Sequence, residues 1–180
     1  QVSKSAVQFK PTNGSAESIL GLGLVLSSDG LILTDKAALG DDTLGKGITA
    51  VLPNGLEVPI QVIQSEISGD IAFVVALLPK GVTLTPVTTL SNLSSIHLGE
   101  RVYSLSGKQA LTLEEGLIKK TIVTPDDDLE TSISPDHLLV GTPLFTALGK
   151  VIGFKTSTQK ANNSFHSLPA LKPIIPRLSR

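Results

Sequence analysis

Short runs of aliphatic and β-branched residues alternate with turn residues along most of the chain. Runs of about four to eight such residues between turns are typical of all-β sandwiches and barrels. In the two clearest hairpins, Asp-Gly and Asn-Gly supply the backbone angles that a tight turn demands. The predicted strands of these hairpins are 19–26 with 31–34, around Ser27-Ser28-Asp29-Gly30, and 48–52 with 56–64, around Pro53-Asn54-Gly55.

Residues 71–77 form a continuous apolar run, which Pro79 and Gly81 end quickly. This pattern predicts a strand buried on both faces, not a helix. Further strands are predicted at 101–105, 116–124 and 151–156. A helix is predicted only near the end of the chain, where Pro169 suits a first turn and Leu171, Ile174, Ile175 and Leu178 share one side. Pro173 and Pro176 keep this helix short.

The composition suits one globular domain with an aliphatic core. The 180 residues are 41% hydrophobic and 17% charged, aromatic residues make up 3%, and tryptophan and cysteine are absent. A net charge of −1 and so few aromatic side chains argue against nucleic-acid binding. No apolar run approaches the ~20 residues of a membrane-spanning helix, so no membrane contact by this domain is expected.

Five segments, in chain order, carry a recurring set of glycine, aliphatic and hydroxyl residues. They are GLGLVLSSDGLILT at 21–34, ITAVLPNGLEVPIQVI at 48–63, SGDIAFV at 68–74, LGERVYSLSG at 98–107 and HLLVGTPL with LGKVIGF between 137 and 154. Together with the closing stretch around Ser167-Leu168-Pro169, they resemble the motifs of trypsin-like serine proteases of the HtrA/Deg type. The resemblance covers roughly residues 18 to 178.

This resemblance implies an all-β fold of two six-stranded antiparallel β-barrels with a cleft between them and a short C-terminal helix. The single domain would occupy 1–180, with an N-terminal barrel at about 18–80 and a C-terminal barrel at about 88–168. The boundary is expected near Pro79 to Thr89, and no PDZ domain is expected in this chain.

The resemblance also locates the catalytic positions, and two of the three have lost their chemistry. Ala37 stands where the family has its histidine and Val140 where it has its serine, while Asp70 retains the acid. A methyl group cannot accept a proton, and valine has no lone pair to attack a carbonyl. Leu138 replaces the glycine whose backbone helps to form the oxyanion hole. We therefore predict a pseudoprotease without serine-type peptidase activity, in which Asp70 has a structural role.

Other chemistry finds little support in the sequence. Without cysteine a thiol route is excluded, and His97, His137 and His166 show no metal-ligand spacing. Ser134, Asp136 and His137 are close in sequence, but on an extended strand they would not form a relay. Residues 126–128 are three aspartates that lack the spacing of a calcium loop, which indicates a solvated loop. No cofactor and no metal are expected.

Three functions remain open. A trypsin-type cleft can add an extended peptide to a strand edge without a nucleophile, so the first is a protein- or peptide-binding scaffold or regulator. Its binding surface would be Leu138, Leu139, Val140, Gly141 and Thr142, with the region around Ala37. The second is a purely structural subunit with a collapsed cleft, in which Val140 is buried. The third is a hydrolase with a relocated site that uses Ser134 or His137.

Location and assembly are expectations from the resemblance. The chain begins at Gln1 and contains no methionine, so we expect a missing N-terminal segment, which in HtrA-like proteins is a signal peptide or a membrane anchor. This predicts an extracytoplasmic protein of the cell envelope. HtrA-like proteins often form trimers through N-terminal aromatic residues, and here only Phe9 is available, so the oligomeric state is left open.

Overall fold

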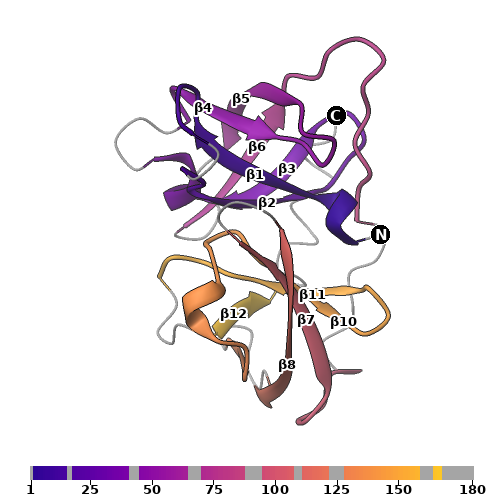
Figure 1. Ribbon diagram of the computed structural model, residues 1–180. Coiled ribbons are helices and arrows are strands. Elements are labelled where there is room, and N and C mark those ends of the chain that lie inside the picture. Colours follow the sequence, from indigo (N-terminus) through magenta and orange to yellow (C-terminus); the bar gives the residue numbers. More distant parts are fainter. Residues whose placement is uncertain are drawn as a thin grey trace.

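Two closed six-stranded β-barrels stacked on one another make up the computed structural model (Figure 1). The structure describes residues 2–15, 18–40, 45–64, 70–87, 95–107, 111–121, 128–158 and 164–167. The strand order is β1-β2-β3-β6-β5-β4 in the N-terminal barrel and β10-β11-β12-β9-β8-β7 in the C-terminal barrel, with every pairing antiparallel. This confirms the predicted fold class.

The strands of the N-terminal barrel are β1 (Ala6–Pro11), β2 (Gly21–Val25), β3 (Leu31–Asp35), β4 (Ile48–Val51), β5 (Glu57–Gln64) and β6 (Ile71–Ala76). Those of the C-terminal barrel are β7 (Arg101–Ser106), β8 (Thr112–Lys120), β9 (Leu129–Thr131), β10 (Pro143–Thr146), β11 (Val151–Phe154) and β12 (Ser164–Ser167). Three short 3₁₀ helices among the described residues are η1 (Val2–Ser5), η2 (Lys36–Leu39) and η4 (Pro135–His137). In that part of the chain, no helix has the length and apolar character needed to span a bilayer.

Strands β3 and β6 carry apolar side chains on both faces because each strand faces two different cores. Successive side chains of a strand point to opposite faces. Ile32 and Val74 point into the core of the N-terminal barrel, whereas Leu33 and Phe73 point out of it, toward the other barrel. The apolar run at 71–77 is continuous because side chains on both faces of β6 are buried.

A shared apolar layer joins the two barrels. Phe73, Leu33 and Leu22 of the N-terminal barrel pack in one buried cluster with Phe145 and Phe154 of the C-terminal barrel. A separate cluster, which includes Val102, Ile118 and Phe165, fills the C-terminal barrel. Because the joining layer is continuous, the relative position of the barrels is fixed by packing.

The N-terminal barrel begins earlier in the chain than the expected start near residue 18. Its first strand is β1, in which Val7 and Phe9 enter the barrel core. Lys10 interrupts the apolar pattern of this strand, and its ammonium pairs with Glu57 of β5 at 2.5 Å. Phe9 is fully buried, so it offers no exposed aromatic surface for assembly.

Three further differences concern local structure. Residues 135–137 form a 3₁₀ turn instead of the expected extended strand, because the fixed φ of Pro135 suits the first position of a helix. The strand expected at 116–124 starts at Thr112 and ends at Lys120. The C-terminal helix expected beyond Pro169 lies outside the described residues.

Candidate functional site

Ala37 lies on η2, directly after strand β3 at the junction of the two barrels. Asp35 caps this 3₁₀ helix, since its Oδ1 accepts a hydrogen bond of 2.8 Å from the Ala37 N–H. The cap fixes the backbone at the position that the resemblance assigns to the catalytic histidine. The Ala37 side chain is partly exposed.

The loop Leu138–Thr142 is tied to both barrels by backbone hydrogen bonds. The Leu22 N–H of β2 donates to the Val140 carbonyl at 2.8 Å, and the Gly141 N–H donates to the Lys155 carbonyl at 2.8 Å. The Leu138 N–H is also occupied, because it donates to the Pro135 carbonyl at 3.1 Å. The loop therefore has a defined position with little freedom to move as a unit.

The Val140 side chain packs against the N-terminal barrel. A Cβ added to Gly21 would lie 3.0 Å from Val140 Cγ2 and 2.5 Å from Ala38 Cβ, so Gly21 leaves room for both side chains. Val140 is half-buried and borders the core of that barrel. The structure thus brings the Val140 position beside the helical turn that holds Ala37.

Glycine is required at position 141. Its φ of +78° is unfavourable for other residues, and an added Cβ would lie 1.7 Å from the Leu22 carbonyl oxygen. The next residue, Thr142, is buried, and its hydroxyl has no hydrogen-bond partner among the described residues. Both residues belong to the predicted peptide-binding set, yet neither presents an exposed side chain.

Asp70 uses its backbone and its side chain to hold neighbouring segments. Its carbonyl accepts the Lys36 N–H at 2.7 Å, and its Oδ2 accepts the Thr158 N–H at 3.1 Å. Lys36 starts η2, whereas Thr158 follows strand β11 in the other barrel. The carboxylate therefore finds a backbone donor instead of an imidazole.

Asp35 is the buried acid of this junction, and sequence reasoning missed it. Its Oδ2 accepts the Ser157 N–H at 2.8 Å and the Ser157 hydroxyl at 3.2 Å, which links β3 to the C-terminal barrel. Burial raises the pKa of the Asp35 carboxyl, the hydrogen bonds from Ser157 and Ala37 lower it, and the charge of Asp70 raises it further. A signal was present, since Leu31, Leu33 and Asp35 alternate along β3 and share the face toward the other barrel.

Lys155 and His166 lie on the C-terminal side, and Asp128 interacts with both. Burial lowers the pKa of the Lys155 ammonium, against the carboxylates of Asp128 and Asp35, which raise it. Asp128 also lies 3.6 Å from His166 Nδ1. The last residue of the predicted acidic loop is thus half-buried and paired, whereas the other two aspartates lie outside the described residues.

The other polar candidates from the sequence lie on or beside the 3₁₀ turn η4. Ser134 precedes the 3₁₀ turn η4 and Asp136 lies within it. Both side chains are exposed, and the side chain of His137 is outside the described part. Across the described ranges, no group of three or more His, Cys, Asp or Glu side chains could hold a metal ion.

Comparisons with known proteins agree with this architecture. The crystal structure of Deg5 matches with a TM-score of 0.76 and 20% sequence identity, over 98% of this chain and 89% of that chain. In all, 724 chains of solved structures match, so the fold alone does not specify a function. No curated protein sequence matches. The model of the family described as "Trypsin-like peptidase domain" matches residues 21–154, and the chain therefore belongs to the trypsin-like peptidase family.

Proposed function

We propose that this protein is a non-catalytic HtrA-like pseudoprotease that binds proteins or extended peptides as a scaffold or regulator. The observation that carries the proposal is the chemistry of the residues at positions 37 and 140. Ala37 offers no base, and Val140 offers an aliphatic side chain that packs against the core of the N-terminal barrel beside Gly21. Without a proton acceptor and an attacking atom, acyl transfer has no starting point.

The backbone of the loop supports the same proposal. Stabilising an oxyanion requires N–H groups that are free and aimed at the developing charge. The Leu138 N–H at the corresponding position already donates to the Pro135 carbonyl. Residual catalysis through transition-state stabilisation is therefore not expected.

Peptide binding would use the apolar side of the loop. Leu138, Leu139 and Val140 are each partly exposed, and the apolar side chains of a peptide could pack against them. The N–H groups of Ser157 and Thr158 already donate to Asp35 and Asp70. The peptide would consequently depend on contacts with the loop itself.

The test combines a binding and a hydrolysis measurement on the same sample. Reduced, carboxymethylated casein should bind the protein in fluorescence anisotropy and remain uncleaved on prolonged incubation. Leu139→Asp should weaken this binding by about tenfold, because it places a charge in the apolar contact. Leu148→Asp is the matched control, since Leu148 is 82% exposed on the β10–β11 turn. Cleavage of casein, or equal loss of binding in both variants, would contradict the proposal.

A second candidate is a purely structural subunit with a closed junction. The contacts of Asp35 and Asp70 with Ser157 and Thr158 favour it, because these carboxylates occupy backbone donors between the barrels. A collapsed cleft would bury Val140 and an open cleft would expose it, and the Val140 side chain is half-buried. Failure of a broad panel of unfolded polypeptides to bind, with the fold intact, would favour this candidate.

We further propose an extracytoplasmic location, based on the likeness to Deg5 in fold and to HtrA-type motifs in sequence. The partner would be a protein or an extended peptide. Cell fractionation of the full-length protein, followed by protease accessibility, tests this location. Recovery only in the cytoplasmic fraction would contradict it.

A further inference from the structure

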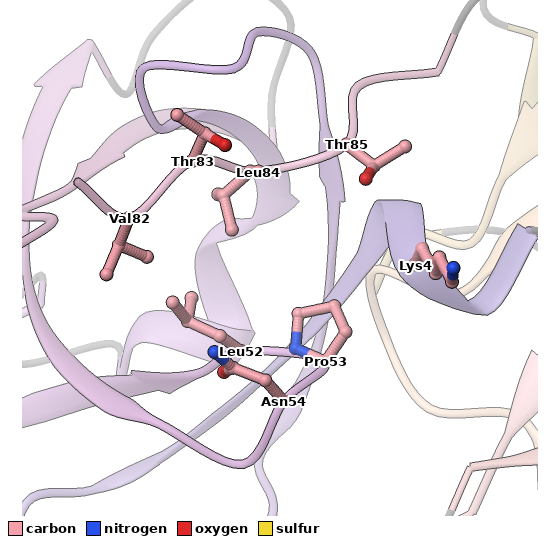
Figure 2. Close-up of a pocket in the computed structure, with 8 residues that line it drawn as sticks. All are labelled: Lys4, Leu52, Pro53, Asn54, Val82, Thr83, Leu84 and Thr85. Atoms are coloured by element: carbon pink, nitrogen blue, oxygen red, sulfur yellow. The ribbon is translucent and has the colours of Figure 1, made fainter.

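A cavity of about 240 Å³ lies in the N-terminal barrel, lined by residues outside the Leu138–Thr142 loop (Figure 2). Its floor is apolar, because Leu52 and Leu84 are buried in the barrel core and Val82 packs against that core. The exposed rim is formed by Lys4, Pro53, Asn54, Thr83 and Thr85. The cavity therefore combines an aliphatic base with a polar edge, as small ligand sites do.

One side of the cavity offers unused backbone donors. Thr83 and Thr85 are exposed while Leu84 between them is buried, which is the alternation of an extended chain. The Leu84 N–H donates to the Ser28 carbonyl at 3.0 Å, on the inner edge of this segment. Among the described residues, the N–H groups of Thr83 and Thr85 have no hydrogen-bond partner. An extended peptide could pair with this outer edge.

Lys4 gives the cavity a positive charge, and the other lining residues are uncharged. Lys4 lies on η1, at the end of the cavity nearest Thr85 (Figure 2). In the part of the chain that the structure describes, its ammonium forms no ion pair. A cation beside an apolar cavity attracts a carboxylate whose attached group is apolar.

We propose that this cavity binds the C-terminal residue of a polypeptide that ends in an aliphatic side chain. The side chain would contact Leu52, Val82 and Leu84, the backbone would pair with the Thr83–Thr85 edge, and the terminal carboxylate would lie beside Lys4. This site is separate from the Leu138–Thr142 loop and does not depend on the function proposed for it.

The experiment uses the full chain and a pentapeptide, Gly-Ser-Thr-Val-Leu, with fluorescein on its N-terminus. Fluorescence anisotropy compares the free-acid peptide with its C-terminal amide on the wild type and on Lys4→Gln. We expect the amide to bind about fivefold more weakly than the acid, and Lys4→Gln to abolish this preference. An equal affinity of acid and amide for the wild type would overturn the proposal, as would a preference that Lys4→Gln leaves unchanged.

Further variants separate this site from non-specific attraction. Thr85→Glu places a carboxylate near Lys4 and should weaken the binding of the free-acid peptide. Thr85→Gln introduces a side chain of similar size without the charge and should not weaken this binding. Lys46→Gln removes an exposed lysine that does not line the cavity and should have no effect. Leu139→Asp should leave the affinity for the pentapeptide intact, because Leu139 does not line the cavity. A failure of the function proposed for the Leu138–Thr142 loop can therefore be distinguished from a failure of the cavity proposal. Isovalerate and the unlabelled peptide are compared as competitors of the labelled peptide. If isovalerate displaces it at the same concentrations as the unlabelled peptide, the cavity is a site for small carboxylates, and the polypeptide proposal is overturned.

Discussion

Gly141 has the strictest backbone requirement in the loop between η4 and β10. Gly141→Ala would combine a φ of +78° with a Cβ 1.7 Å from the Leu22 carbonyl oxygen. We expect a loss of about 3 kcal/mol or more in the free energy of unfolding, because backbone of both barrels must move. Urea denaturation measures the loss.

Gly47→Ala is the matched control for Gly141→Ala. Gly47 has a similar φ of +71°, but an added Cβ would meet nothing within 4 Å. Strain alone should cost about 1 kcal/mol there. Equal losses in the two variants would mean that the contact with Leu22 does not determine the conformation of the loop.

The raised pKa of Asp35 predicts how the free energy of unfolding changes with pH. Because burial raises its pKa in the folded state, its contribution to stability is complete below the ordinary value of 3.8 and is lost as pH rises through the raised value. Asp35→Asn removes this titration and also exchanges one carboxylate oxygen for a donor that faces Ser157 or Ala37. We expect the unfolding free energy of wild type minus that of Asp35→Asn to fall as pH rises above about 4.

Thermal unfolding of wild type and Asp35→Asn between pH 3.5 and 7 tests this dependence. The other carboxyl groups titrate in both proteins, so the difference between the two curves reports on Asp35. A difference that is constant with pH, or one that grows as pH rises, would contradict the assignment.

At the scale of elements, strands that are buried on both faces were the easiest to predict. Apolar runs marked β3 and β6 clearly because each strand contributes to two cores. Strand β1 was missed because Lys10 is buried only by virtue of Glu57, which lies far along the chain. Strand β9 has three residues, too few for a periodic pattern to emerge.

The site was only partly predictable for a related reason. Motif spacing predicts Ala37 and Val140 as the vacated catalytic positions, and local sequence determines the turns that carry them. The contact of Asp35 with Ser157 joins residues 122 positions apart, and no local pattern encodes such a pair. Similarly, the pairing of Asp128 with His166 required β12 and β9 to be neighbours.

A histidine can be introduced at position 37 and a serine at position 140, the positions that the resemblance assigns to the catalytic base and nucleophile. Ala37→His with Val140→Ser would supply a base and a nucleophile, yet the Leu138 N–H would still donate to the Pro135 carbonyl. Serine protease activity would also require a free oxyanion donor. We expect no turnover of a fluorogenic peptide library above background for the double variant. Measurable turnover by the double variant that is absent from the single variant Ala37→His would refute the role assigned to Leu138.

At the scale of the whole molecule, a substitution of Asp70 tests whether this acid has a function beyond structure. Its carboxylate accepts one backbone N–H, from Thr158, at 3.1 Å. An asparagine oxygen can accept the same bond, so Asp70→Asn should change stability by less than about 0.5 kcal/mol. Binding of carboxymethylated casein should also be unchanged, as measured by anisotropy. A large loss of binding with unaltered stability would instead indicate direct contact with the ligand.

The shared apolar layer predicts that the two barrels unfold together. Ile32 is buried in the core of the N-terminal barrel, whereas the single tyrosine, Tyr103, lies on β7 of the C-terminal barrel. Ile32→Val should cost about 1 kcal/mol by removing one buried methylene, which lowers Tm by about 2–4 °C for a chain of this size. Because Leu33 and Phe73 pack with Phe145 and Phe154 across the junction, the C-terminal barrel should lose its support at the same temperature. Tyrosine fluorescence and far-UV circular dichroism should therefore report the same lowered Tm, and a tyrosine transition that stays at the wild-type temperature would mean that the barrels fold independently.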